Sequence, residues 1–363
     1  MVKKKICFIA QFPPPIHGLS KAIETLYDSE LSGIFEFEKI NITDNKRFLI
    51  NLIKIIKSKG DLFYFTISQT RGGNIRDLVI LKVLRIQRKR CLIHLHGGYY
   101  RELVEHDLPK WQRKANYKAM KTVAGGIVLG ETLKDIFQGM IPEEKIYIVK
   151  NCVDDRYFMK RSQFDRKIQR MNKTNIKHVL YLSNMIKSKG YQKVLEMAEL
   201  EKQRSLVGEK RNFHFDFAGL FFDKKEEKDF LSYIKQNDLQ EYVTYYGKVT
   251  GEEKQKLLEK GSIFILLTCY PKEGQPISIL EAMGNGMMII TTNHAGIPDV
   301  VKNYDNGLVV PKDTPVKLIF QEMMSLGQEK VEEICCYNYN YAKKNFSQKC
   351  YINDMKHIFE TVR

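Results

Sequence analysis

The sequence predicts an α/β protein with two doubly wound, parallel-sheet domains. The chain has 363 residues, more than one hydrophobic core ordinarily serves, and short apolar runs alternate with helical patterns along it. The alternation stops at a polar, basic stretch, 156–177, and then begins again. A hydrophobic fraction of 43% with 28% charged residues excludes a largely disordered chain.

The first half contains four short apolar runs that end in polar residues or glycine, which predicts buried parallel strands. These runs are residues 3–10, 61–68, 91–97 and 125–130. Helical patterns lie between them. The clearest covers 46–59, with its apolar residues at Phe48, Leu49, Leu52, Ile53 and Ile56. We expect this helix to pack on the sheet through these side chains, with its lysines in water.

The second half repeats the pattern with six expected strands, at 177–183, 213–220, 242–247, 262–269, 287–292 and 307–310. Expected helices cover 191–202, 224–236 and 252–259. The stretch 156–177 is the expected linker. The predicted domains are therefore 1–160 and 161–344. A final helix at 345–363 has Phe346, Tyr351, Ile352, Met355 and Phe359 on one face.

Several classes of protein are excluded by short patterns. No apolar run approaches the roughly 18–20 residues of a membrane-spanning helix. The apolar stretch 6–10 ends at three prolines, so it is typical of a buried strand rather than a signal peptide. Seven cysteines without C-x-x-C spacing favour reduced thiols. We therefore expect a cytoplasmic chain without a metal site.

Positive charge is concentrated in the first domain. Residues 1–150 carry 26 Lys and Arg against 15 Asp and Glu, a net charge of +11, and the remaining residues carry +5. Such a balance favours an anionic partner: nucleic acid, an anionic lipid surface or a phosphorylated substrate. A lysine-rich surface without a partner is equally consistent with it.

The loop after 262–269 has the residues of a sugar-nucleotide site. Pro276 suits the first position of a short helix, whose free amides at Ile277 and Ser278 favour an anion such as phosphate. Glu273 and Glu281 lie on either side of that helix start. Carboxylates are poor phosphate ligands but good acceptors for sugar hydroxyls. A molecule with hydroxyls at both ends and phosphates between them would fit.

Three further residues follow expected strands. Lys189 precedes a helix and could neutralise a diphosphate, although it could also be an ordinary solvated lysine. Gly18 could let a ligand approach the backbone, or simply make a turn. His96 shares a strand face with His94 and lies at the strand end, where a structural role is also open. No G-x-G-x-x-G dinucleotide fingerprint is present.

The block 245–310 resembles the nucleotide-sugar signature of glycosyltransferase family 4, and the Glu-x7-Glu spacing of Glu273 and Glu281 is its most specific feature. The resemblance extends to 151–154, to 182–191, to the HGG segment and to the Gly18 loop. It implies the GT-B fold, in which two Rossmann-like domains face each other across a cleft and the last helix returns to the first domain. It also implies a retaining reaction without a bound metal.

The resemblance assigns roles residue by residue. Glu273 would bind hydroxyls of the transferred sugar, and Glu281 the nucleotide ribose. The diphosphate would be bound by Lys189 with the amides of Ile277 and Ser278, and Gln275 would add a donor contact. His96 would lie beside the reacting sugar, and Gly18 would let the first domain approach the phosphates.

Two positions depart from the pattern of this family. Asn184 stands where an arginine is usual, so it can supply only neutral hydrogen bonds to the donor. Pro276 replaces a frequent glycine and removes one N–H donor. Both changes concern the contacts to phosphate, and neither removes the two carboxylates.

The function expected from this resemblance is a retaining glycosyltransferase that uses a nucleotide sugar, with UDP inferred from family frequency. The acceptor would be a saccharide, carried on a polyprenyl diphosphate, in surface polysaccharide biosynthesis. The basic patterns at 46–59, 75–90 and 110–121 are candidates for peripheral contact with an anionic membrane face. Two alternatives remain: a sugar-nucleotide 2-epimerase, and a non-catalytic protein that binds nucleic acid or lipid.

Overall fold

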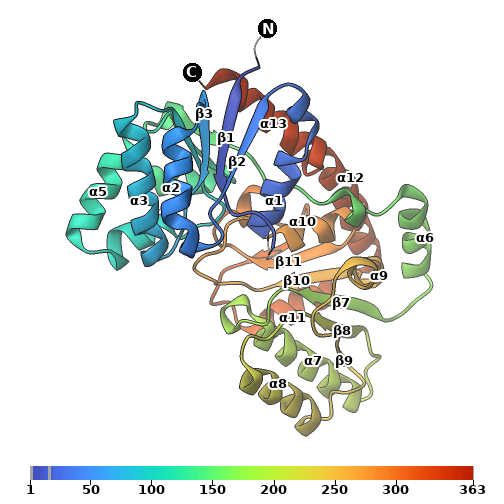
Figure 1. Cartoon of the computed structure of the whole chain (residues 1–363). Helices are drawn as coiled ribbons and strands as arrows, with labels where there is room; N and C mark the ends of the chain where they lie inside the picture. Colours follow the sequence, from blue (N-terminus) through green and yellow to red (C-terminus); the bar gives the residue numbers. More distant parts are fainter. Residues whose placement is uncertain (1–2, 15–17, 363) are drawn as a thin grey trace. The chain divides into compact units, whose positions relative to one another are not determined.

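The computed structural model describes residues 3–14 and 18–362, which form two compact units (Figure 1). Unit 1 contains the residues up to Cys152, the segment Lys272–Gln275 and the C-terminal residues from Gln348. Unit 2 contains Val153–Pro271 and Pro276–Ser347. The boundaries thus fall at residues 152 and 347, against 160 and 344 in the division expected from the sequence, and four residues of the expected second domain pack with unit 1.

Unit 1 is built on a six-stranded, all-parallel sheet, sheet A, with strand order β2-β1-β3-β4-β5-β6. Its strands are β1 (Lys5–Ala10), β2 (Glu36–Asn41), β3 (Leu62–Thr66), β4 (Cys91–His94), β5 (Gly125–Val128) and β6 (Ile146–Ile148). The central strands are buried along almost their whole length, as expected for a parallel sheet covered on both faces.

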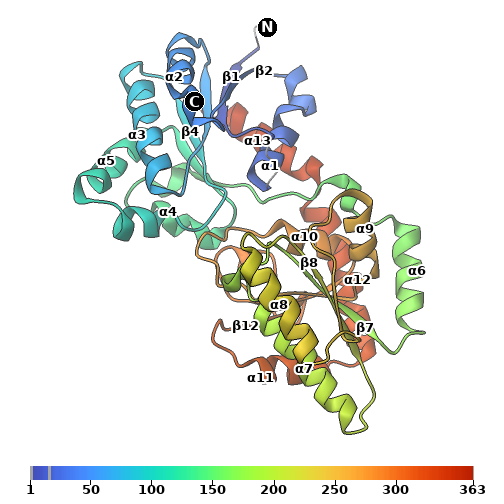
Figure 2. The ribbon, with the colours of Figure 1, turned by 60° about the horizontal axis from the view of Figure 1, so that its bottom comes forward.

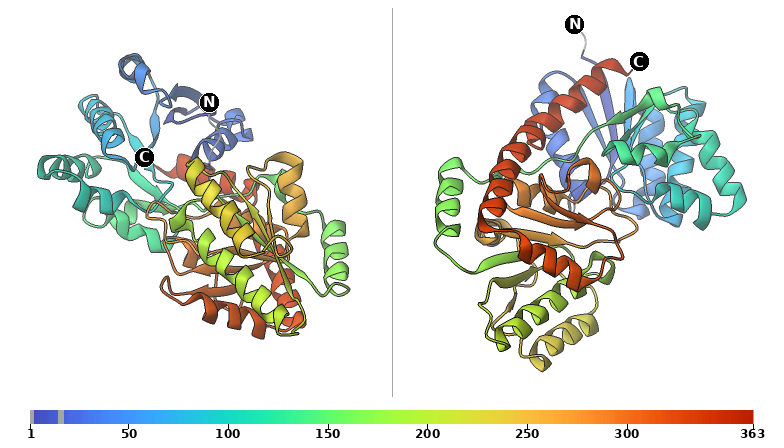
Figure 3. Two further views of the ribbon diagram at one scale, coloured as in Figure 1. Left: turned by 90° about the horizontal axis from the view of Figure 1, so that it is seen from below. Right: turned by 180° about the vertical axis from the view of Figure 1, so that it is seen from behind.

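Helices cover both faces of sheet A. They are α1 (Gly18–Tyr27), α2 (Phe48–Lys57), α3 (Arg71–Ile86), α4 (Tyr100–Glu102), α5 (Lys110–Met120) and α13 (Gln348–Thr361). Figure 1 shows α2, α3 and α5 side by side. The final helix α13 runs beside the strands of sheet A, where Tyr351, Met355 and Phe359 join the same core as Phe8 and Tyr64 (Figure 3, right).

Unit 2 has a second all-parallel sheet, sheet B, in the order β12-β11-β10-β7-β8-β9. Its strands are β7 (Lys177–Leu182), β8 (Phe213–Ala218), β9 (Val243–Tyr245), β10 (Ile263–Leu266), β11 (Met288–Thr292) and β12 (Gly307–Val310). Counted from the first strand of the unit, this is the order 3-2-1-4-5-6 of the Rossmann fold. The α/β fold with two doubly wound sheets is therefore confirmed.

The helices of unit 2 are α6 (Arg161–Met171), α7 (Tyr191–Leu206), α8 (Lys224–Gln236), α9 (Gly251–Lys260), α10 (Ile277–Gly284), α11 (Val316–Ser325) and α12 (Gln328–Asn345). Figure 2 shows α7 and α8 lying side by side within the unit. The large core of this unit joins both layers of helices to sheet B. None of the helices among residues 3–14 and 18–362 is long and apolar enough to cross a membrane.

The prediction of a linker at 156–177 is wrong, because half of this stretch forms α6 and all of it belongs to unit 2. This helix buries Phe164 and Met171, and Phe164 stacks on Tyr339 of α12 with ring centroids 4.1 Å apart. The prediction failed because the helix is mostly charged and contributes few apolar side chains. Its packing depends on a partner helix that is distant in the sequence.

Candidate active site

Two loops leave sheet B at the point where its strand order reverses. Strands β7 and β10 are neighbours there, and their carboxyl ends lead into residues 183–190 and 267–276. In open α/β sheets, ligands bind at this topological switch point. The loops are joined by a hydrogen bond from the Cys269 amide to the Ser188 carbonyl, 2.7 Å long. Lys189 lies with its Nζ 5.2 Å from the ring centroid of Tyr270.

Gly190 makes the close approach of these two loops possible. Its backbone is left-handed, with φ +82°, and a Cβ at this position would lie 2.4 Å from the Leu267 carbonyl oxygen. A residue with a side chain would suffer both backbone strain and a collision with main-chain atoms. Gly190 therefore sets the position of Lys189 relative to the end of β10.

We expect Gly190→Ala to lower the free energy of unfolding by about 2–4 kcal/mol, the sum of left-handed strain and steric overlap. Gly208→Ala is the matched control, because Gly208 has φ +87° but nothing within 4 Å of an added Cβ. That control should cost only about 1–2 kcal/mol. Urea denaturation of both variants measures the difference, and equal losses would contradict the assigned contact with Leu267.

Helix α10 begins at the same switch point. Pro276 is its N-cap residue and Ile277 its first helical residue, one position later than predicted. The first backbone hydrogen bond of the helix runs from the Ile279 amide to the Pro276 carbonyl, at 3.1 Å. The amides of Ile277 and Ser278 precede it and belong to the first turn, whose donors have no acceptor inside the helix. Asn184 lies exposed in the neighbouring loop after β7.

Glu281 is buried on α10 and forms an ion pair that the sequence did not predict. Its Oε1 is 2.6 Å from Nζ of Lys254, which comes from α9 and lies 4.2 Å from the ring centroid of Tyr157. Burial raises the pKa of Glu281, while Lys254 acts to lower it. The ammonium thus holds one oxygen of the carboxylate in a fixed position.

In unit 1, two histidines lie close together at the end of β4, His94 as its last residue and His96 just after it. Their ring centroids are 3.9 Å apart with the rings tilted by 31°, so the two side chains lie on the same side of the chain, as predicted. Tyr64 bonds Nδ1 of His94 at 2.6 Å. Burial lowers the pKa of His96 to about 3, although a hydrogen bond between His96 and the Asn151 side chain opposes this shift. His96 is therefore neutral at pH 7.

The Nε2 atom of His96 is buried and has no hydrogen-bond partner among the residues that the structure describes. An unsatisfied buried nitrogen of this kind costs about 1–3 kcal/mol unless a water or ligand supplies the missing bond. This supports a position of His96 at a binding site.

The segment Lys272–Gln275 packs against the backbone of His96 and Gly97 within unit 1. An added Cβ on Gly274 would lie 2.9 Å from Gly97 Cα and 3.0 Å from the His96 carbonyl oxygen. The Gln275 side chain accepts from the Asn151 amide at 2.7 Å and donates to the Leu129 carbonyl at 3.0 Å. Asn151 also donates its side-chain Nδ2 to the Gln275 carbonyl at 2.8 Å. The buried Glu273 is thereby held next to the loop that carries His96.

Gly18 is the first residue of α1, the helix that follows β1. Sheet A reverses its strand order between β1 and β3, so α1 begins at the switch point of this sheet. Residues 15–17, which precede Gly18, lie outside the described part of the chain.

The predicted residues thus form two groups. Unit 1 holds Gly18, His96, Glu273 and Gln275, and unit 2 holds Asn184, Lys189, Pro276, Ile277, Ser278 and Glu281. Reasoning from the sequence missed Lys254, because nothing in α9 indicates which of its lysines faces a carboxylate. It also missed the hydrogen bonds between Gln275 and Asn151, which fix the segment Lys272–Gln275. The motif at 151–154 had drawn attention to that part of the chain.

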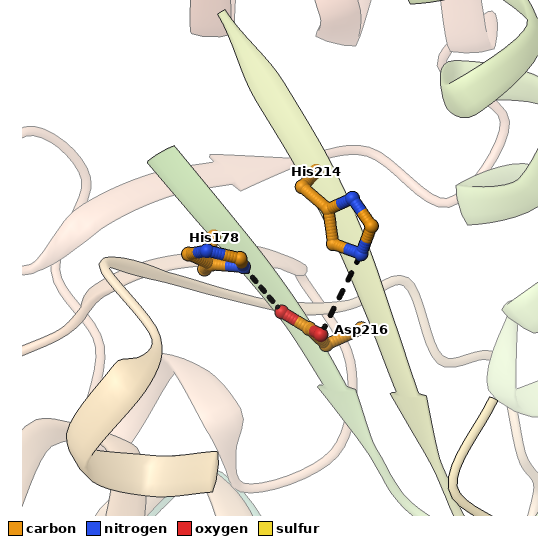
Figure 4. Close-up of side chains that lie close together, drawn as sticks. All are labelled: His178, His214 and Asp216. Carbon is orange, nitrogen blue, oxygen red and sulfur yellow. Dashed lines mark hydrogen bonds and ion pairs between the residues drawn. The ribbon is translucent and has the colours of Figure 1, made fainter. Parts of the chain in front are cut away.

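A separate polar cluster lies toward the amino ends of β7 and β8 (Figure 4). His178 Nδ1 is 2.7 Å from Asp216 Oδ2, and His214 Nε2 is 3.8 Å from Asp216 Oδ1. Two cations contact the same groups: Lys260 lies 3.2 Å from Asp216, and Arg211 donates to His214 at 2.9 Å. Lys260 already contacts the Asp216 carboxylate, and Nε2 of His214 bonds the Thr244 hydroxyl at 2.8 Å, so the arrangement favours a structural ion-pair network.

Comparison with known proteins finds similarity to glycosyltransferases. Residues 162–329 match the model of glycosyl transferases group 1. WcaL of Salmonella typhimurium, by name a colanic acid biosynthesis glycosyltransferase, is 22% identical over 295 residues, which cover 78% of this chain and 67% of WcaL. N-acetyl-α-D-glucosaminyl L-malate synthase of Bacillus anthracis is 27% identical over 195 residues, covering 52% of this chain and 46% of the synthase.

A solved structure covers nearly the whole chain. Anabaena HepE in complex with UDP superimposes with a TM-score of 0.73 at 16% sequence identity, covering 98% of this chain and 100% of HepE. This similarity establishes the two-domain GT-B fold. The family model and the named relatives support a glycosyltransferase of this fold.

Proposed function

We propose that this glycosyltransferase moves a sugar from a UDP-sugar to a saccharide acceptor in surface polysaccharide biosynthesis, without a bound metal. The name of WcaL supports the pathway class, and the complexes of HepE with UDP and UDP-glucose support the donor. The observation that carries the proposal is the switch point of sheet B. There Lys189 and the first turn of α10 leave neighbouring strands at the end where ligands of such sheets bind.

The diphosphate of the donor would be bound by one cation and one helix end. Lys189 supplies a full positive charge, and the Ile277 and Ser278 amides supply donors aligned with the dipole of α10. Glu281 would accept hydrogen bonds from the ribose. Because Lys254 occupies one of its two oxygens, the ribose hydroxyls would share this carboxylate with the ammonium.

Glu273 and His96 would act at the transferred sugar. Glu273 would accept hydrogen bonds from sugar hydroxyls, and its segment is fixed by the bonds between Gln275 and Asn151. The neutral His96 would use its buried Nε2 to bind a further hydroxyl. Both groups would therefore orient the anomeric carbon, and neither would act as a nucleophile.

In the reaction, the bond from the anomeric carbon to the β-phosphate oxygen breaks while a bond forms to the acceptor oxygen. Positive charge develops on the sugar ring and negative charge on the leaving phosphate. Lys189 and the amides of α10 stabilise the negative charge, which is electrostatic stabilisation of the transition state. For a retaining outcome, the acceptor attacks from the face of the leaving group and gives its proton to the phosphate oxygen.

The acceptor would be a lipid-linked saccharide at the cytoplasmic face of a membrane, to which the chain would bind peripherally. The net charge of +11 over residues 1–150 supports this part of the proposal, because polyprenyl diphosphates and many bilayer surfaces are anionic. The expected site is therefore one where a donor from solution meets an acceptor fixed in a bilayer.

A thermal-shift panel of UDP-, GDP- and ADP-sugars, each with magnesium or with EDTA, tests the donor. We expect UDP-sugars to raise the melting temperature equally in both buffers, since a ligand at about 100 times its Kd adds about 2.7 kcal/mol to stability. The shift should disappear in Lys189→Met and persist in Lys225→Met, which alters an exposed lysine on α8. A shift that requires magnesium would contradict the metal-independent mechanism.

Product analysis tests the reaction class. The transferred sugar should appear on the acceptor with the anomeric configuration that it had in the donor. When the acceptor is omitted, the nucleotide sugar should remain almost unchanged. A new sugar nucleotide formed without acceptor would instead indicate an epimerase. An inverted product would overturn the retaining mechanism.

A further inference from the structure

Helix α2 presents its apolar side to solvent, contrary to the packing expected from its sequence. Four of its large aliphatic side chains are between 45% and 71% exposed: Leu49, Ile50, Ile53 and Ile56. The polar Asn51 is buried instead, and it donates Nδ2 to the Asn41 carbonyl at the end of β2, 2.8 Å away. Only Asn51 and Ile55 are buried along this helix.

The exposed aliphatic residues form one continuous stripe. At 3.6 residues per turn, positions 49, 50, 53 and 56 fall within an arc of roughly 120°. Asn51 and Ile55 fall on the opposite side of the helix. We define the four aliphatic residues as the α2 stripe. A stripe of this kind normally faces a core, so its exposure indicates a partner that is not part of this chain.

Positive charge surrounds the α2 stripe. Residues 45–59 contain five basic and no acidic residues. Among them, Lys54 and Lys57 are exposed on α2 itself. Residues 82–90, which include the end of the adjacent helix α3, also contain five basic and no acidic residues. One of these, Lys89, stabilises the C-terminal end of α2. Its Nζ donates to the Ile55 carbonyl at 2.8 Å and to the Ser58 carbonyl at 2.7 Å.

A second apolar feature lies on the neighbouring helices α3 and α5. A groove of about 340 Å³ between them is lined by Ile75 and Trp111, which are 49% and 61% exposed, and by Lys82, Arg85 and Lys118. Since α3 packs beside α2 (Figure 1), apolar and basic side chains recur across adjacent helices of unit 1.

We propose that the α2 stripe inserts into the interfacial layer of an anionic lipid bilayer, with the surrounding lysines and arginines bound to lipid phosphates. This combination of an apolar stripe and flanking lysines is what an interfacial helix requires. A second copy of the chain is a poorer occupant, because it would bring two strongly basic surfaces together. The inference deepens the membrane part of the proposed function by naming the residues that bind the bilayer.

Co-sedimentation with sucrose-loaded vesicles tests the proposal. We expect the chain to bind vesicles of equimolar phosphatidylcholine and phosphatidylglycerol, and to bind phosphatidylcholine alone at least about tenfold more weakly. The Leu49→Ser/Ile53→Ser variant should lose about tenfold or more in partitioning, because two aliphatic side chains no longer leave water. Lys54→Gln/Lys57→Gln should lose binding chiefly to the anionic vesicles.

Matched controls come from unit 2. Leu206 and Val207 are 74% and 76% exposed, so Leu206→Ser/Val207→Ser removes apolar side chains at least as exposed as Leu49 and Ile53. Lys225→Gln/Lys228→Gln removes two exposed lysines of α8. Both controls should bind vesicles like the parent. Unchanged melting temperatures of all variants show that they fold.

The proposal is overturned if the parent does not bind anionic vesicles, or if the α2 variants bind as well as their controls. It is also overturned if gel filtration shows a dimer of the parent that the Leu49→Ser/Ile53→Ser variant loses. The thermal shift with UDP reports the donor site separately. Lost vesicle binding with an intact UDP shift supports the α2 stripe, whereas vesicle binding without any UDP shift would contradict only the proposed reaction.

Discussion

Glu273→Gln is expected to lower kcat/KM for glycosyl transfer by about 10²–10³-fold, the usual cost of removing one charged contact that acts in a transition state. The carboxylate is proposed to bind sugar hydroxyls while positive charge develops on the sugar ring. Glutamine has nearly the same shape but carries no charge. It should therefore preserve the packing of the buried segment Lys272–Gln275 while removing the electrostatic contribution.

Steady-state kinetics of UDP release with acceptor present measure this effect, and Glu144→Gln is the control, since Glu144 is exposed in the same unit. The melting temperature and the thermal shift with UDP should change little in Glu273→Gln, because the nucleotide would be bound by residues of unit 2. Turnover within a factor of about three of the parent would remove Glu273 from the mechanism. A lost UDP shift would mean that the residue acts in binding the nucleotide.

The elements that were predicted correctly are those with strong local patterns. The buried strands of both sheets are short, continuous apolar runs, and helix α8 matches its prediction at both ends. The missed strands, β2 and β6, both lie at the edges of sheet A. The exposed β2 carries charges at Glu36, Glu38 and Lys39, which protect an edge from further pairing but hide the strand pattern.

The candidate site was predictable only to the level of which residues follow which strands. Lys189 and the start of α10 could be placed because parallel strands bring their carboxyl ends to one edge. The Lys254–Glu281 ion pair could not be predicted, since it joins helices α9 and α10 through side chains. The orientation of α2 was predicted wrongly for a related reason. A period of 3.6 identifies an apolar stripe but not whether that stripe faces a core or a bilayer.

Lys167 is a buried lysine within the stretch that was expected to be a linker, and it makes the stability of the fold depend on pH. Its side chain is 2% exposed on α6, and its Nζ donates to the Asn285 carbonyl at 2.7 Å and the Leu258 carbonyl at 3.3 Å. Burial lowers the pKa of Lys167 to about 7, against an unfolded value near 10.4. Between these two values the unfolded state binds more protons than the folded state. The free energy of unfolding therefore rises with pH in this range, by up to about 1.4 kcal/mol per pH unit.

Lys167→Met should remove this dependence. Below pH 7 the lysine is charged in both states, so the parent bears the full cost of burying the ammonium and the variant gains most there. From about pH 7 to pH 9 the gain should shrink by roughly 2–3 kcal/mol, as the folded parent becomes free to bury a neutral amine.

Urea denaturation at several pH values measures the difference between variant and parent, in which the titration of other groups cancels. Lys173→Met, on an exposed lysine just after α6, should leave the pH profile unchanged. A constant difference between Lys167→Met and the parent across this range would mean that Lys167 is protonated when folded and that α6 opens readily to water.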